Sequence, residues 1–341
     1  MATTALAAPV YDARLHTILR FAVGTAGAFV ICEAMGWYPS FLAPLLAGVL
    51  LANLPVAPPF KVGAVLILVQ GVSAYGAYLI TASLHETPAI LFGSLGVILM
   101  VSFANLSQGR GFLPILLTLI SFATVPIVTM MAPQEANGLS LALTRGMIVA
   151  MAAVWLAHAA WPKVLPPSSR DAQPVSTRHF ALAVTGVAIV LPMMLVYLMY
   201  GITDALPVLI TTVVLVINFD PKRGAMQALA MMIGNFIGGL IALLAHAVLQ
   251  VVPSLMFLAL IAFLIAVPFA VRIERGGPGG AVALITFNQA MVMFSLSLAP
   301  GGSSPSLWTT RLFQFALACT FSVGMMSLLI PRLKALDEGR A

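Results

Sequence analysis

Long apolar runs, separated by short charged or turn-forming connections, dominate this chain of 341 residues. The chain is 61% hydrophobic and only 8% charged, whereas about a quarter of the residues of a soluble protein are charged. Most runs are close to the length of about 20 residues that a helix needs to cross a bilayer. They are continuous rather than alternating, which excludes a membrane β-barrel. The sequence therefore predicts an all-α polytopic membrane protein with about twelve transmembrane helices.

Charged and turn-forming residues set the limits of these spans. The spans cover residues 17–37, 40–56, 61–84, 88–107, 111–132, 138–161, 179–200, 204–219, 222–250, 253–272, 279–298 and 306–330. If the N-terminus is cytoplasmic, every second connection holds Lys or Arg. The opposite connections hold Glu86, Glu135 and Asp204 but neither Lys nor Arg. Because cytoplasmic loops are enriched in Lys and Arg, we expect both termini in the cytoplasm of a multi-pass protein of the bacterial inner membrane.

The chain contains an internal repeat. The segment Ser140-Leu-Ala-Leu-Thr-Arg145 and the segment Ser306-Leu-Trp-Thr-Thr-Arg311 share the pattern Ser-Leu-x-x-Thr-Arg, and Gly71 and Gly76 recur as Gly234 and Gly239. Each copy holds six spans, an even number, so the two copies enter the membrane in the same sense and form a parallel repeat. We predict a first six-helix repeat over 1–165, a cytoplasmic linker over 166–178 and a second repeat with a short tail over 179–341.

Arg145 and Arg311 lie inside apolar spans, at matching places in the two repeats. A charge in a membrane helix costs at least ~2.5–3.5 kcal/mol on the insertion scale, and such residues commonly mark ion or substrate pathways. A guanidinium fork suits a carboxylate, with Thr144 and Thr310 as adjacent hydroxyl donors. We therefore predict that these four residues bind an anionic substrate. The alternative is that the arginines extend to the membrane surface or form structural ion pairs.

Other polar residues within the spans are further candidates. Asn288 and Gln289 interrupt the eleventh span; they either line a substrate pathway or form hydrogen bonds between helices. Glu33 is the one carboxylate well inside a span. It is a candidate for proton coupling, with pairing to an arginine or a position at the membrane interface as alternatives.

The second and eighth spans are the shortest, and each has a proline near its start, Pro44 and Pro207. Short, proline-interrupted segments at matching places in two repeats point to a transport site. The alternative is a kink that neighbouring helices tolerate.

The chain resembles the fusaric acid resistance and aromatic acid exporter (FUSC-like) family of bacterial inner-membrane proteins, in a short form without large cytoplasmic domains. The resemblance rests on the six-plus-six repeat, the glycine helix after Asp220, and Thr144-Arg145 before Trp161-Pro162, echoed by Thr310-Arg311 before Ile330-Pro331. It implies proton-coupled efflux of aromatic carboxylic acids and, in many members, a periplasmic adaptor of the membrane-fusion type. A passive organic-anion channel resembling the plant malate channels is the alternative, followed by a membrane scaffold or a lipid-processing enzyme.

Other function classes fit the sequence poorly. The net charge is +6, but the basic residues are scattered singly between apolar runs, which does not favour nucleic acid. Cys32 and Cys319 both lie within apolar runs, so we expect no metal site and no cofactor. The motifs of P-loop ATPases, zinc proteases, esterases and dithiol redox enzymes do not occur, and we expect that the chain is not an enzyme.

Overall fold

The computed structural model describes residues 13–162, 179–201, 206–217, 221–299 and 305–338, and these ranges contain α-helices and no β-strand. The helices are α1 (Ala13–Ala34), α2 (Leu42–Asn53), α3 (Phe60–Leu84), α4 (Pro88–Ser107), α5 (Phe112–Met131), α6 (Pro133–Ala160), α7 (His179–Tyr200), α8 (Leu206–Val216), α9 (Pro221–Leu249), α10 (Leu255–Arg275), α11 (Gly277–Leu298) and α12 (Pro305–Glu338). Ten of them are long and apolar enough to cross a membrane. The predicted all-α polytopic membrane fold is confirmed.

The helices α2 and α8 are only 12 and 11 residues long. At 1.5 Å per residue each extends for about 18 Å or less, against a hydrocarbon core of about 30 Å. The predicted spans 40–56 and 204–219 therefore each contain a half-length helix. After α2 the backbone is extended at Leu54 and runs without helix to Pro59.

The non-helical segment after α2 has side-chain partners for its carbonyl groups. Arg20 of α1 donates from Nη1 to the carbonyl oxygen of Pro55 at 3.3 Å. Trp155 of α6 donates from Nε1 to the carbonyl oxygen of Pro58 at 3.0 Å. Irregular backbone at membrane depth is tolerated only where protein or water satisfies its polar groups. These two donors thus allow the second span to be half helix and half extended chain.

Pro44 does not interrupt the helix of the second span, contrary to the sequence-based expectation. Pro44 is the third residue of α2 and Pro207 the second residue of α8. In the first turn the backbone N–H has no partner within the helix, so proline frees no carbonyl there and causes no kink. The second span holds a short helix because α2 ends at Asn53.

Two predicted spans differ from the observed helices by more than a few residues. The helix α6 begins at Pro133 rather than near residue 138, and α12 continues through Pro331 to Glu338. The apolar run ends where charged residues begin, but Arg, Lys, Leu, Ala and Glu are all good helix formers. A helix therefore extends beyond the part of its sequence that is apolar.

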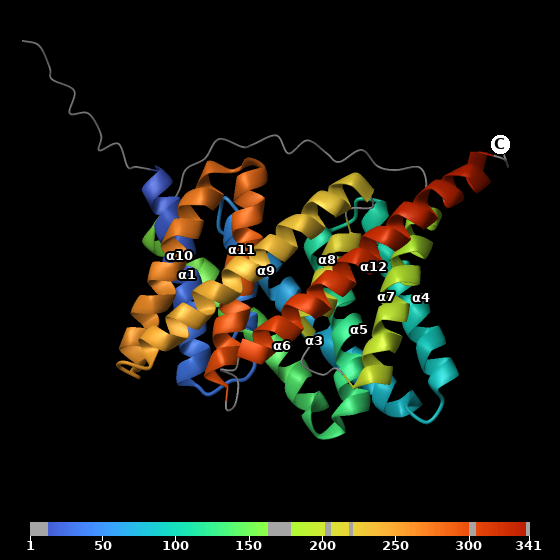
Figure 1. Cartoon of the computed structure of the whole chain (residues 1–341), viewed down its shortest axis with the longest axis horizontal. Coiled ribbons are helices and arrows are strands. Elements are labelled where there is room, and N and C mark those ends of the chain that lie inside the picture. The colour runs from blue at the N-terminus through green and yellow to red at the C-terminus, as the bar shows by residue number, and fades with distance from the viewer. Residues whose placement is uncertain (1–12, 163–178, 202–205, 218–220, 300–304, 339–341) are drawn as a thin grey trace, which may run out of the picture.

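The helices pack into two groups, and each group combines both sequence repeats. In one group α1 packs along α10, together with α2, α6 and α11; in the other α4 packs along α7, together with α5, α8 and α12. The helices α3 and α9 connect them, α3 packing on α5 and α6, and α9 on α11 and α12. Most of these helix–helix contacts occur twice, once in each half of the chain: α3 on α5 corresponds to α9 on α11, and α2 on α6 corresponds to α8 on α12. This is the pattern expected for a duplication. The repeats are thus interleaved in space (Figure 1).

Two hydrophobic cores correspond to the two groups. In the first group Phe29 of α1 and Phe294 of α11 are in contact, with ring centroids 5.6 Å apart, and Phe21 lies edge-on to Phe287 at 5.0 Å. In the other group the core includes Phe103 of α4. Each core is therefore built from helices of both repeats.

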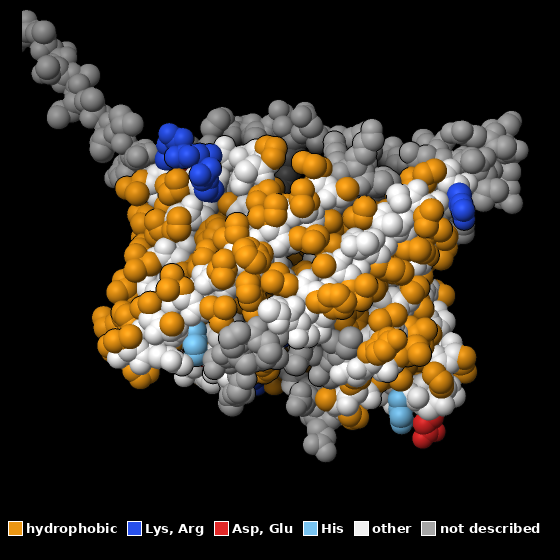
Figure 2. Space-filling view, in the orientation of Figure 1, with side chains coloured by type: hydrophobic (Ala, Val, Ile, Leu, Met, Phe, Trp, Pro, Cys, Tyr) orange, Lys and Arg blue, Asp and Glu red, His pale blue; other side chains and the backbone are white. Residues whose placement is uncertain are grey.

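The outer surface matches a membrane environment. Figure 2 shows a broad apolar belt on the visible face, with Lys and Arg side chains near one edge and acidic and His side chains at the opposite edge. At the edge where α1 begins, Arg14 forms an ion pair with Glu274 at the end of α10, with Nε and Oε1 3.2 Å apart. This separation of charges fits a protein whose middle zone faces lipid.

Candidate functional site

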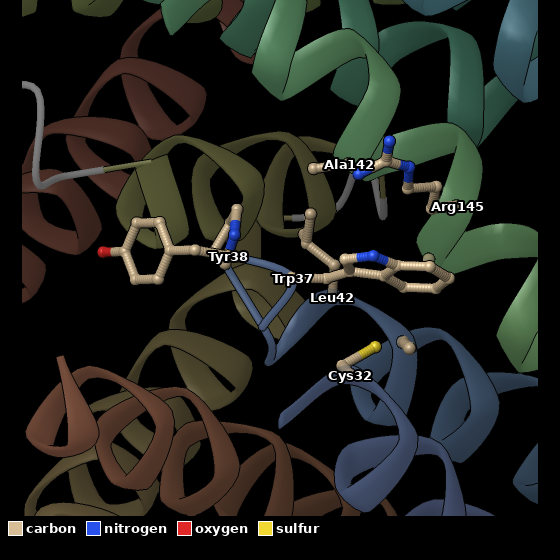
Figure 3. A pocket seen from close by; sticks show the side chains of 9 residues that line it. Cys32, Trp37, Tyr38, Leu42, Ala142 and Arg145 are labelled. Carbon is tan, nitrogen blue, oxygen red and sulfur yellow. The ribbon is translucent and has the colours of Figure 1, made fainter. Parts of the chain in front are cut away.

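The clearest candidate site is a recess around Arg145. The residues that line it come from the end of α1, the following turn, the start of α2 and the middle of α6: Cys32, Trp37, Tyr38, Pro39, Leu42, Ala43, Ala142, Arg145 and Gly146. The space between them is about 260 Å³, including solvent at the open mouth. Figure 3 shows the guanidinium group of Arg145 on one side of the Trp37 ring and Cys32 on the other.

The charge of Arg145 has no anionic partner among the residues that the structure describes. The side chain is half-buried. Its recorded contact is with the indole of Trp37, where Cζ lies 5.2 Å from the ring centroid. Such a cation–π contact stabilises by about 0.5–2 kcal/mol and does not neutralise the charge. The recess therefore presents a positive group that a bound carboxylate can pair with.

The start of α2 adds to the positive potential of the recess. Leu42 and Ala43 form the first turn of α2 and line the site. The N–H of Leu42 makes only a long bond of 3.5 Å to the carbonyl oxygen of Pro39. First-turn N–H groups and the helix dipole attract anions. A half-length helix with its N-terminus directed at the binding site is also how several transporters hold anionic substrates.

Gly146 allows α6 to approach the start of α2 closely. A Cβ atom at this position would lie 3.2 Å from Cβ of Leu42 and 3.5 Å from the backbone nitrogen of Ala43. The residue after Arg145 must therefore be small for the arginine to lie beside the helix terminus. The sequence could not show this contact, because the first residue of α2 was not fixed by its apolar pattern.

The aromatic surface of the recess comes from the turn after α1. Gly36 has a φ of 62°, a left-handed conformation that glycine adopts without strain. The backbone N–H of Trp37 then bonds to the carbonyl oxygen of Cys32 at 2.9 Å, which holds the indole against Arg145. Tyr38 points away from the guanidinium in Figure 3, and its side chain is 61% exposed. Sequence reasoning missed Trp37; its one local signal is a Trp directly after a helix-ending Gly.

Glu33 lies next to the recess and joins the two repeats. Its carboxylate accepts a hydrogen bond from the hydroxyl of Ser40, and the hydroxyl oxygens of Ser40 and Ser295 are 2.6 Å apart. Ser295 belongs to α11, in the second repeat. Among the described residues Glu33 forms no ion pair, so the structure does not show the pairing with an arginine that the sequence left open. Proton coupling through Glu33 stays a prediction.

The other three predicted anion-binding residues, Thr144, Thr310 and Arg311, lie outside the recess. Thr144 donates to the carbonyl oxygen of Ser140 at 2.9 Å and faces Gly71 of α3, away from the recess. Arg311 is buried on α12, with 6% of its surface exposed, and Thr310 next to it is exposed. Since α6 and α12 belong to different helix groups, the structure brings neither Thr310 nor Arg311 to the Arg145 recess.

Asn288 and Gln289 point to two sides of α11. The side-chain oxygen of Asn288 lies 3.4 Å from the position a Cβ of Gly48 would occupy, so Asn288 faces α2 where the two repeats meet. Gln289 is buried, with 8% of its surface exposed. Neither residue lines the recess around Arg145. Among the described residues, no group of three or more His, Cys, Asp or Glu side chains is placed to hold a metal ion.

Fold and site together define a multi-pass, all-helical membrane protein with a positively charged recess. Residues 17–157 match a family that carries only the description "Protein of unknown function (DUF2955)". The match runs from α1 into α6 and so includes every residue of the recess. No curated protein and no solved structure matches the chain.

Proposed function

We propose that this protein is an efflux transporter of the bacterial inner membrane for organic anions, most of all aromatic carboxylic acids. The observation that carries the proposal is the position of Arg145. Its half-buried guanidinium has no acidic partner among the described residues, and it lies beside the aromatic ring of Trp37 and the first turn of α2.

The chemistry of the recess suits a carboxylate attached to an apolar ring. The guanidinium fork donates two parallel hydrogen bonds to the carboxylate oxygens. The first-turn N–H groups of α2 add to the stabilisation of the negative charge. Pro39, Leu42 and Ala142 offer apolar contact for the ring, with the edge of Trp37 beside them. The space of about 260 Å³ includes open solvent, and its enclosed part holds about one water molecule, so we expect a small acid with a single ring to bind at the open mouth with its carboxylate toward Arg145.

Proton coupling through Glu33 would act on the hydrogen bonds of its carboxylate. An ionised Glu33 accepts from Ser40, which also contacts Ser295 of α11. A protonated Glu33 has one acceptor position fewer and becomes a donor. Protonation would turn the charge-assisted bond between Glu33 and Ser40 into a neutral one of roughly half the strength, and would so loosen the end of α1 from Ser40, which contacts α11.

The remaining parts of the proposal rest on the sequence. The division into repeats 1–165 and 179–341 follows from the duplicated motifs, and the whole linker 166–178 lies outside the described residues. The cytoplasmic placement of both termini follows from the distribution of Lys and Arg. The resemblance to aromatic acid exporters adds a periplasmic membrane-fusion adaptor as a partner, which co-purification from the source membrane would test.

Flux measurements on the full-length protein in proteoliposomes test the proposal. Labelled benzoate, cyclohexanecarboxylate and hexanoate are loaded separately, with and without an imposed pH gradient. We expect transport of benzoate above hexanoate, and benzoate accumulation against its own gradient when a pH gradient is present. Large voltage-driven benzoate currents without accumulation would instead identify a passive anion channel. No flux of any of the three acids would refute the proposal.

A further inference from the structure

The second repeat contains a set of buried polar groups without partners. Asn235 of α9 is fully buried, and neither its Nδ2 nor its Oδ1 has a hydrogen-bond partner among the described residues. The same holds for Oε1 of Gln289 on α11 and for Nε1 of Trp308 on α12. A buried amide without a hydrogen bond is costly, and native proteins usually satisfy such groups with protein or ordered water.

The equivalent helices of the first repeat satisfy comparable groups. Between α3 and α5, Gln70 donates from Nε2 to the hydroxyl of Ser121 at 3.0 Å. Ser73 and Thr118 form a second bond between these helices, also at 3.0 Å. The pair α9 and α11 corresponds to α3 and α5 after a shift of six helices. Between α9 and α11 the buried amides of Asn235 and Gln289 have no such bonds to other described residues.

Close glycine contacts show where the side chain of Asn235 points. A Cβ at Gly234 would lie 3.0 Å from the hydroxyl of Thr286, and one at Gly238 would lie 2.7 Å from the backbone nitrogen of Ala290, so both face α11. Gly239 instead contacts the indole of Trp308 on α12. Successive helix residues are about 100° apart, which puts Asn235 between these two directions. Its amide thus faces a seam along α9, between the side that packs on α11 and the side that packs on α12.

The other two groups adjoin the same seam. Gln289 directly precedes Ala290, whose backbone contacts α9. Phe287 packs on Phe21 of α1, and Gln289 lies on the other side of α11 from Phe287. Trp308 contacts Gly239, and its ring centroid is 5.3 Å from that of Phe236. Asn235 and Gln289 are both near the middle of their helices. These two amides therefore lie deep in the protein, whereas Trp308 reaches α9 from the first turn of α12.

The chemistry of the set identifies the ligand. It offers donors, Nδ2 of Asn235 and Nε1 of Trp308, and acceptors, Oδ1 of Asn235 and Oε1 of Gln289. A site for an anion would present donors, and a site for a cation would present acceptors. A mixture of both suits water, and buried waters typically make about three hydrogen bonds to otherwise unsatisfied groups.

We propose that α9, α11 and α12 enclose a buried water-binding site, formed by Asn235, Gln289 and Trp308, that hydrates a substrate passage through the second repeat. Arg311 lies one turn after Trp308 on the buried face of α12 and so borders this passage. The water site stands on the contacts of these residues alone. Its role in transport rests on the proposed efflux function.

Hydroxyl-radical labelling by X-rays tests the water site, because it oxidises side chains next to bound water. With the full-length protein in lipid nanodiscs, we expect Trp308 to be labelled in the wild type and several-fold less in Asn235→Leu. Trp155 is the matched control, since its indole N–H already bonds to Pro58, and its labelling should not change. Gln289→Met provides a second variant if Asn235→Leu folds poorly. An unlabelled Trp308 in the wild type, or equal labelling in all variants, would overturn the site.

Benzoate flux through the same proteins tests the transport role. We expect Asn235→Leu to lower benzoate flux several-fold while its melting temperature stays equal or rises, since an apolar side chain no longer buries an unpartnered amide. A variant that loses Trp308 labelling but keeps wild-type flux would refute the passage. A wild type without benzoate flux would contradict the proposed function and leave the labelling result, and so the water site, intact.

Discussion

Replacing Arg145 separates the effect of its charge from the effect of its shape. Arg145→Ala removes both the charge and the fork, whereas Arg145→Lys keeps a positive charge but loses the planar group that lies over Trp37. Hydrogen bonds to charged groups each stabilise by about 1.5–3 kcal/mol. Loss of both bonds removes about 3–6 kcal/mol and should therefore reduce benzoate affinity by at least about 100-fold, since about 1.4 kcal/mol corresponds to a factor of ten.

The lysine variant should fall between wild type and alanine. A single ammonium can form one of the two hydrogen bonds to the carboxylate, so about 1.5–3 kcal/mol, or roughly 10-fold or more in affinity, is lost with the other. Stability should change little in either variant, because the contact with Trp37 amounts to about 0.5–2 kcal/mol. The assay is the concentration dependence of labelled benzoate flux in proteoliposomes, with the melting temperature measured on the same preparations.

Arg110→Ala is the matched control for these variants. Arg110 is exposed and donates to Asn105, in the connection after α4 and outside the recess. Its removal should leave the apparent affinity for benzoate unchanged. Equal benzoate affinity in Arg145→Ala and in the wild type would refute the assignment of Arg145 as the carboxylate-binding residue.

Four further substitutions, one of them a control, test the coupling and the packing. Ser295→Ala removes the contact between α11 and Ser40, so we expect benzoate flux to continue but to lose its response to an imposed pH gradient; an unchanged response would exclude this link. Trp155→Phe leaves the Pro58 carbonyl without its donor and should lower the free energy of unfolding by about 1–3 kcal/mol, measured by thermal unfolding. An unchanged melting temperature would show that this bond does not stabilise the non-helical segment after α2. Gly186→Ala puts a Cβ 2.6 Å from the ring of Phe103, between α7 and α4, and should cost about 1–3 kcal/mol by overpacking. Gly93→Ala, with nothing within 4 Å of its Cβ, should be neutral or slightly stabilising; equal melting temperatures for the two glycine variants would contradict the observed packing of α4 on α7.

The sequence by itself determined which segments are membrane helices. Apolar runs and the charges between them are local properties, and a helix of about 20 apolar residues is the one way to satisfy that backbone in lipid. The twelve predicted spans therefore each contain an observed helix. The sequence also predicts a duplication, because Thr144-Arg145 and Thr310-Arg311 have the same residues at matching places.

Only the tertiary structure decided how these helices pair and what surrounds Arg145. Membrane helices are apolar on nearly all faces, so their periodicity does not say which face meets which neighbour. The packing of α1 on α10 and of α4 on α7 interleaves the repeats, and no local pattern predicts it. The recess likewise depends on the residue at which α2 begins and on the turn that places Trp37 against Arg145 of α6. These two residues are more than 100 positions apart in the sequence. Sequence identified the buried charge, and packing determined the aromatic ring and helix terminus beside it.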